Sequence, residues 1–169
     1  PTSYPKVGDQ FIDISFYDWA NDRHIKLSDL KGKVIYIDFW TYWCKGCQPL
    51  MKKTNELVKK NKYKWGHKVA VIGLSCDSAL YNIKKHINKT GWTAVTQTWA
   101  GEQKYAGRSI PTLLYGVNTY PTAMVIDQSG KIVFKGLAYK LKAEEFIDNL
   151  LAKEAPENKL KYENVTTRS

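Results

Sequence analysis

The nine residues "TYWCKGCQP" at positions 41–49 place two cysteines, Cys44 and Cys47, three positions apart. Such a pair is typical either of half a structural zinc site or of a redox couple. The chain has one further cysteine, Cys76, and its three histidines are isolated from one another. A structural zinc site usually needs four ligands, as two cysteine pairs or one pair with two closely spaced histidines. The sequence therefore favours a redox couple and no metal ligands.

Length and composition bound the class of protein. The chain has 169 residues, of which 43% are hydrophobic and 25% are charged, and this suits a single globular domain. We assign that domain to residues 1–155 and a polar tail to residues 156–169. No apolar run approaches the roughly 20 residues that cross a bilayer. The sequence begins at Pro1, so we expect membrane association only through a leader or anchor that it does not contain.

The net charge of +10 raises the question of a nucleic acid or a membrane surface as partner. The lysines are spread over many segments, with the densest group between residues 52 and 64, and no nucleic-acid motif accompanies them. We interpret them as a solvated basic face and predict a monomer with no nucleic-acid partner. Attraction to acidic proteins or lipid headgroups stays open.

Apolar patterning predicts an α/β fold with a central mixed sheet flanked by helices. Strands are expected at residues 10–16, 33–40, 68–76, 122–127 and 132–136. Helices are expected from Cys44 to about Lys62, around residues 80–87 and around residues 146–151. The alternation of strands and helices, followed by a hairpin, predicts a sheet that begins parallel and ends antiparallel.

This order places the cysteine pair at the junction between a buried strand and a helix. Cys44 is expected at the helix N-terminus, where unpaired N–H groups and the helix dipole favour a thiolate. Cys47 lies one turn further along the same face. An exposed first sulfur and a more covered second sulfur are what thiol–disulfide exchange needs.

Two segments resemble the thioredoxin superfamily. "IDFWTYWCKGC" (37–47) carries the family's acidic residue, its tryptophans and its cysteine pair, and "YGVNTYPTAMVIDQSGK" (115–131) resembles the segment with its cis-proline. The resemblance implies a thioredoxin fold in which Asp38 is a buried acid that moves protons near Cys47. It also implies that Trp43, Tyr120 and Pro121 shape a substrate groove, with a cis bond at Tyr120–Pro121.

A second segment, "SIPTLL" (109–114), imitates the cis-proline segment. Its proline, Pro111, is followed by residues that must still lead into a strand, and Ser109 followed by Ile-Pro suits a helix start. We therefore predict a trans bond at Ile110–Pro111 and assign the cis bond to Pro121.

The N-terminal part is similar to the TlpA/ResA-like group, membrane-associated thioredoxin-like reductases of bacteria. "LSDLKGK" (27–33) leads into the first core strand as it does in that group, and the stretch between Cys76 and Pro121 matches the length of its helical insertion. The resemblance implies an N-terminal β-hairpin and a thiol–disulfide oxidoreductase that reduces protein disulfides outside the cytoplasm. It implies an upstream electron-donor protein and no cofactor besides the Cys44–Cys47 disulfide.

Two alternative functions stay open on the same fold. A thiol peroxidase is suggested by Thr41, three residues before Cys44, although Ile37 stands where the peroxidase motif has a proline. A copper-delivery module is the other, although the thioredoxin-fold carriers place one more residue between their cysteines. We expect Cys76 to be a packed, inert thiol, and we expect His67 and His86 on the surface.

Overall fold

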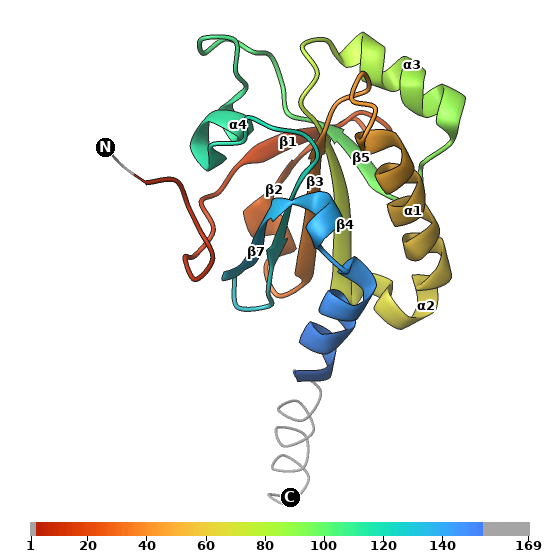
Figure 1. The fold of residues 1–169 in the computed structure, drawn as a ribbon, viewed down its shortest axis with the longest axis vertical. Coiled ribbons are helices and arrows are strands. Elements are labelled where there is room, and N and C mark those ends of the chain that lie inside the picture. The colour runs from red at the N-terminus through yellow and green to blue at the C-terminus, as the bar shows by residue number, and fades with distance from the viewer. Residues whose placement is uncertain (1–2, 154–169) are drawn as a thin grey trace, which may run out of the picture.

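The computed structural model describes residues 3–153, and the predicted tail at 156–169 lies outside them together with the predicted domain end at residue 155. One seven-stranded sheet has the order β2-β1-β5-β4-β3-β6-β7 (Figure 1). Its strands are β1 (Ser15–Asp18), β2 (Arg23–Lys26), β3 (Val34–Trp40), β4 (Val69–Ser75), β5 (Thr96–Trp99), β6 (Thr122–Ile126) and β7 (Ile132–Leu137). The helices are α1 (Cys47–Lys60), α2 (Lys62–Trp65), α3 (Leu80–Thr90), α4 (Ile110–Tyr115) and a last helix over 143–153, with 3-10 turns η1 (Leu27–Leu30), η2 (Gly66–Lys68) and η3 (Ala138–Lys140).

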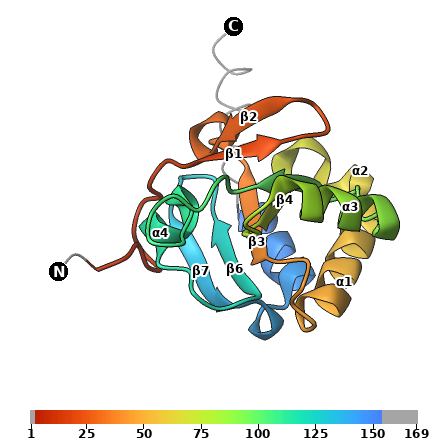
Figure 2. The same ribbon diagram turned by 90° about the horizontal axis from the view of Figure 1, so that it is seen from above.

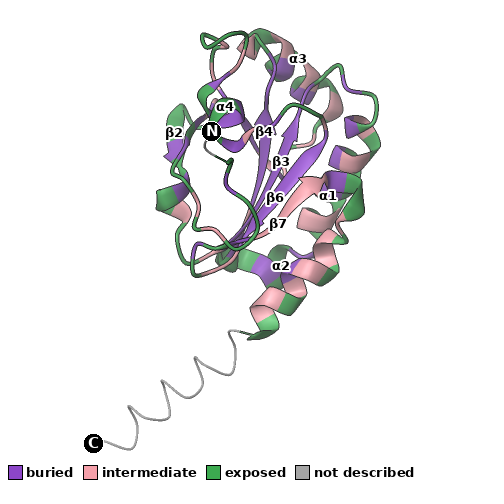
Figure 3. Ribbon diagram, turned by 60° about the vertical axis from the view of Figure 1, so that its left-hand side comes forward, coloured by how far each residue is buried: buried purple, intermediate pink, exposed green. Residues whose placement is uncertain are grey.

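The centre of the sheet is mixed, as the sequence predicts. β3 pairs in parallel with β4, from Val34 opposite Val69 onward, and antiparallel with β6, with Ile35 opposite Ile126. Every residue of β3 and β6 is buried, which Figure 3 shows as purple strands in the middle of the molecule. Strands that are covered on both faces need continuous apolar runs, and these runs made them recognisable in the sequence.

The two faces of the sheet carry separate hydrophobic clusters. Successive side chains of a strand point to opposite faces, so Ile35 and Ile37 belong to one cluster and Val34, Tyr36 and Trp40 to the other. The second cluster also includes residues of α1, α3 and the last helix, whereas α4 contributes to the first. Figure 2 shows α4 and α1 on opposite sides of the strands. The disulfide loop therefore lies on the α1 side.

An N-terminal hairpin precedes the core, as the family resemblance implies. Its first strand begins later than the predicted residue 10, because Gln10 forms only an isolated bridge with Lys131 and β1 starts at Ser15. β1 then joins the sheet through Tyr17, which pairs with Trp99 of β5. β5 itself is missing from the sequence prediction, since "TQTW" is short and half polar.

The segment between β5 and β6 contains α4, which confirms a helical insertion before the cis-proline strand. Ser109 precedes the helix and Pro111 lies in its first turn, where a missing N–H costs no hydrogen bond. Gly116 ends α4 with a φ of 65°, a left-handed conformation that glycine adopts without strain. Within the described residues, none of the helices has the length and apolar character of a membrane span.

Candidate functional site

The cysteine pair lies between the end of β3 and the start of α1. The predicted helix start at Cys44 is wrong by three residues, because α1 begins at Cys47. The residues between them form turns, in which the Cys44 N–H donates to the Thr41 carbonyl at 3.3 Å and the Cys47 N–H to the Cys44 carbonyl at 3.2 Å. The helix also ends at Lys60 rather than Lys62, and Asn61 separates it from α2.

Cys44 and Cys47 form a disulfide with their Cα atoms 5.3 Å apart. Cys47 is fully buried and Cys44 is 9% exposed. The predicted order of accessibility is therefore confirmed, but the prediction of an exposed first sulfur is too strong. The backbone N–H of Cys47 also points at the Cys44 sulfur, at 3.2 Å from nitrogen to sulfur. A donor in that position stabilises negative charge on the first sulfur once the disulfide opens.

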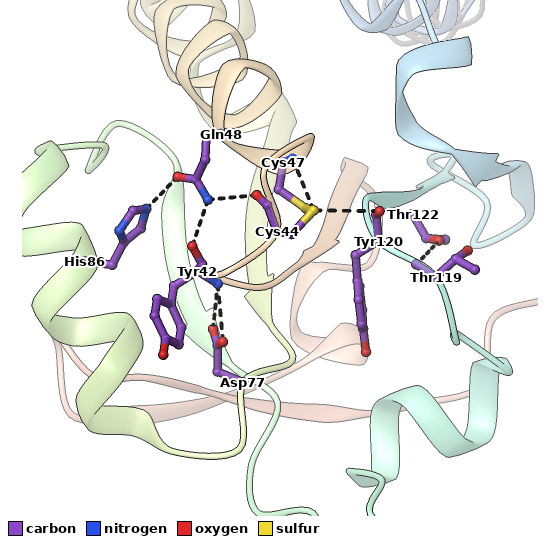
Figure 4. The surroundings of a disulfide bond; sticks show 9 residues. All are labelled: Tyr42, Cys44, Cys47, Gln48, Asp77, His86, Thr119, Tyr120 and Thr122. Atoms are coloured by element: carbon purple, nitrogen blue, oxygen red, sulfur yellow. Dashed lines mark hydrogen bonds between the residues drawn. A yellow bond between two sulfur atoms is a disulfide. The ribbon is translucent and has the colours of Figure 1, made fainter.

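The predicted cis-proline segment faces the disulfide. The Tyr120–Pro121 bond is cis, and it is the one cis bond among the described residues. The Tyr120 carbonyl oxygen lies 3.7 Å from the Cys44 sulfur, as Figure 4 shows. The ring of Trp43 meets the ring of Tyr120 edge-on with centroids 6.2 Å apart, and Trp43 is 63% exposed. An exposed tryptophan, a half-buried tyrosine and a backbone carbonyl thus adjoin the more accessible of the two cysteines.

Asp38 lies inside β3 with no exposed surface, as predicted. It lies two residues from Tyr36 and two from Trp40 along the strand, so its side chain points to the same face of the sheet as theirs, where Cys47 also packs. Neither carboxylate oxygen has a hydrogen-bond partner among the described residues. Burial raises the pKa of Asp38 to about 8, because a charged carboxylate without partners is strongly disfavoured in the interior. A pKa of about 8 leaves the group mostly protonated at neutral pH, with a minor ionised fraction that can accept a proton.

Three residues near the disulfide loop escaped the sequence prediction. Asp77, just after β4, accepts a hydrogen bond from the backbone N–H of Tyr42. Gln48, in the first turn of α1, donates to the carbonyls of Tyr42 and Cys44. His86 of α3 bonds to Gln48 and is partly exposed, so it is less open to solvent than the surface position that the sequence predicts. The contacts of Asp77 with Tyr42 and of His86 with Gln48 join segments that only the fold brings together, and the local bonds of Gln48 have no sequence signature.

Cys76 is buried at 4% exposure, in agreement with the prediction of a packed thiol. Its thiol donates to the Leu74 carbonyl at 3.6 Å and lies close to the Tyr120 side chain, and burial raises the pKa of the Cys76 thiol far above its ordinary value. A thiol that stays protonated is a poor nucleophile. Among residues 3–153 there is no cluster of three or more histidine, cysteine or carboxylate side chains arranged to hold a metal ion.

Comparison with known proteins yields a family and a set of relatives. The sequence profile described as thioredoxin-like matches residues 32–132. The thiol-disulfide oxidoreductase ResA of Bacillus anthracis is 37% identical over 111 residues, which are 66% of this chain and 58% of the relative. A ResA of Bacillus thuringiensis subsp. konkukian is 32% identical over 130 residues, which are 76% of this chain and 69% of the relative.

The fold also has close neighbours among solved structures. The crystal structure of a candidate thiol:disulfide interchange protein DsbE from Chlorobium tepidum superposes with a TM-score of 0.73 at 26% identity. The match covers 87% of this chain and 99% of that one. The chain spans only 58% of the length of the first curated relatives. Their activity is therefore a proposal for this chain.

Proposed function

Since the chain belongs to the thioredoxin-like family, we propose that it is a thiol–disulfide oxidoreductase that exchanges protein disulfides through Cys44 and Cys47. The observation that carries the proposal is the disulfide at the start of α1, whose more accessible sulfur lies 3.7 Å from the Tyr120 carbonyl. An extended substrate segment can pair with the backbone beside that carbonyl. The activity named for the ResA relatives supports the same chemistry.

In the reducing direction the exchange begins with both cysteines reduced. The Cys44 thiolate attacks one sulfur of the substrate disulfide, and the other substrate sulfur leaves as a thiolate. Cys47 then loses its proton and attacks the Cys44 sulfur, which forms the Cys44–Cys47 bond and releases the second substrate thiolate. Two electrons pass to the substrate and two protons complete its thiols. An electron-donor protein would return the pair to the dithiol state.

Asp38 is the proposed proton acceptor for Cys47. It shares the sheet face of Cys47, and its raised pKa of about 8 is close to that of an ordinary thiol. A proton transfer between groups of similar pKa has a small energetic cost in either direction. The same carboxyl can therefore accept a proton when Cys47 attacks and return it when the disulfide is reduced.

Reduction rather than oxidation, and a location outside the cytoplasm, are the finer parts of the proposal. Both rest on the resemblance of the N-terminal part, including "LSDLKGK" (27–33), to the TlpA/ResA-like group. The substrates would be protein disulfides that present an extended segment to Trp43 and the Tyr120 carbonyl.

Reduction of insulin by dithiothreitol, followed by turbidity, tests the proposal. Catalysis by the wild-type chain should be abolished in Cys44→Ser, and Cys47→Ser should accumulate mixed disulfides with its substrates because nothing resolves them. A wild-type chain that adds nothing to the rate with dithiothreitol alone would refute the proposal. Parallel assays for peroxide consumption and bound copper test the two alternative functions on the same sample.

A further inference from the structure

The amide of Gln48 makes hydrogen bonds in three directions. Its Nε2 donates to the carbonyl oxygens of Tyr42 and Cys44, each at 3.0 Å, and its Oε1 lies 2.7 Å from Nε2 of His86 (Figure 4). The opposite orientation of the amide would direct Oε1 at two carbonyl oxygens and Nε2 at the imidazole. The network thus allows one orientation of the amide, and in it every polar atom has a partner.

His86 holds this arrangement from a separate helix. Because Gln48 Oε1 is an acceptor, His86 Nε2 must carry the hydrogen. The imidazole is half-buried among aromatic rings, with centroids 5.8 Å from Trp40, 5.7 Å from Trp92 and 6.3 Å from Tyr42. These contacts restrict the orientation of the imidazole. Its hydrogen bond to Gln48 in turn restricts the first turn of α1.

The carbonyl that Gln48 holds belongs to the reacting cysteine. The Cys44 oxygen accepts from Gln48 and from the Cys47 N–H, while the Cys44 sulfur faces the Tyr120 carbonyl. A peptide carbonyl carries partial negative charge, so a Cys44 carbonyl free to rotate toward the sulfur would disfavour the thiolate. The hydrogen bond from Gln48 holds the Cys44 carbonyl oxygen on the α1 side, so that it does not turn toward the Cys44 sulfur.

We propose that Gln48 and His86 act together as positioning residues, which hold the Tyr42–Cys44 backbone in the geometry that favours a thiolate at Cys44. The inference rests on the proposed function for its role in turnover. Its physical content is independent of turnover, because the reactivity of Cys44 toward a small alkylating agent needs no protein substrate. This pair of positioning residues is not part of the family's cysteine motif, because His86 lies on α3.

The test is the rate of iodoacetamide alkylation of Cys44 in the reduced full chain, measured against pH by peptide mass spectrometry. Gln48→Leu removes all three bonds, and His86→Phe keeps an aromatic ring but removes the donor. We expect Gln48→Leu to raise the apparent pKa of Cys44 and to lower its alkylation rate at pH 7 about tenfold. His86→Phe should have a smaller effect, and the double variant should be no slower than Gln48→Leu alone.

Two matched variants separate positioning from general loss of structure. His86→Gln retains a side-chain donor and should restore part of the wild-type rate, and His67→Phe changes an exposed histidine of η2 and should leave the rate unchanged. Gln48→Met serves in place of Gln48→Leu if the latter fails to fold. Unchanged alkylation in Gln48→Leu, or additive effects in the double variant, would overturn the proposal. The two proposals can fail separately. If the wild-type chain does not reduce insulin but the Gln48 and His86 variants are alkylated more slowly, the positioning role is upheld and the proposed function is refuted.

Discussion

Asp38, inside β3, and Asp77, in the loop after β4, are two buried carboxylates near the same disulfide with opposite surroundings. Asp38 has no hydrogen-bond partner within the described part of the chain. Asp77 accepts from the Tyr42 N–H at 3.2 Å and from the Ser75 hydroxyl at 2.7 Å. Burial raises the pKa of both, but at Asp77 the bonds from Ser75 and Tyr42 act against that rise.

The comparison separates two uses of one residue type. An unpartnered carboxyl in the interior destabilises the fold when it ionises, and this cost is tolerable where a proton must be exchanged. A partnered carboxylate satisfies backbone donors and orders the loop that it holds. Under the proposed function Asp38 exchanges a proton with Cys47, whereas Asp77 holds the backbone of Tyr42. Substitutions at the two positions should then act on stability with opposite signs.

The largest expected effect is a gain of stability in Asp38→Asn. The asparagine resembles the protonated carboxyl but needs no proton uptake, and a native pKa of about 8 against about 3.9 unfolded corresponds to on the order of 4 kcal/mol at pH 7. Urea unfolding of the oxidised chain measures this change. Disulfide reduction should slow in the same variant, because Cys47 loses its proton acceptor. A variant less stable than the wild type would show that the Asp38 carboxylate has a stabilising partner.

Asp77→Ala should change stability in the other direction, with a loss of about 1–3 kcal/mol. The substitution leaves the N–H of Tyr42 and the hydroxyl of Ser75 without their acceptor. Asp77→Asn is the matched control, because it keeps one acceptor oxygen and should lose less. Equal stability of the alanine variant and the wild type would remove the distinction between the two carboxylates.

The pH dependence of unfolding sharpens the same distinction. Because the pKa of Asp38 is higher in the folded than in the unfolded chain, the folded state binds one more proton between about pH 4 and pH 8. Stability from this group should therefore fall by about 1.4 kcal/mol per pH unit as pH rises through that interval. The wild-type curve should be steeper than that of Asp38→Asn by this amount, and parallel curves would contradict the raised pKa.

Cys76 should show the smallest effect. Its thiol lies near both carboxylates, whose charges each raise its pKa further, yet it takes no part in the proposed exchange. Cys76→Ala should keep insulin reduction within about tenfold of the wild-type rate, which is roughly 1.4 kcal/mol of transition-state stabilisation. A larger loss would mean that the contact between Cys76 and Tyr120 contributes to substrate positioning.

The parts of the fold that the sequence predicted are those with strong local patterns. β3 and β6 are continuous apolar runs, the cysteine pair has a fixed spacing, and Pro121 has a local context that distinguishes it from Pro111. The helix start was misplaced because turns between Cys44 and Cys47 have no distinct composition. β5 was missed because its four residues gain their strand character from pairing with β4 and β1.

The site residues divide in the same way. Asp38 was identified through the resemblance of "IDFWTYWCKGC" (37–47) to the thioredoxin superfamily, and the apolar strand around it favoured its burial. Asp77 and His86 were not, because their partners lie far along the chain: His86 is 38 residues from Gln48, and Asp77 is 35 from Tyr42. Gln48 was missed although its partners Tyr42 and Cys44 are only six and four residues away, because a glutamine in a first helical turn has no distinctive pattern. Glutamine and histidine on partly exposed helix positions are ordinary, and only the approach of α3 to α1 brings these two together.

The N-terminal hairpin has a consequence for how copies of the chain meet. It covers the outer edge of β5, whose sequence "TQTW" carries no charge, and replaces it with the edge of β2, which carries Arg23 and Lys26. An uncharged edge strand invites pairing with a strand of another molecule, whereas cationic side chains along the edge discourage it. A chain that began after residue 26 should therefore self-associate through β5 at concentrations where the longer chain stays dispersed.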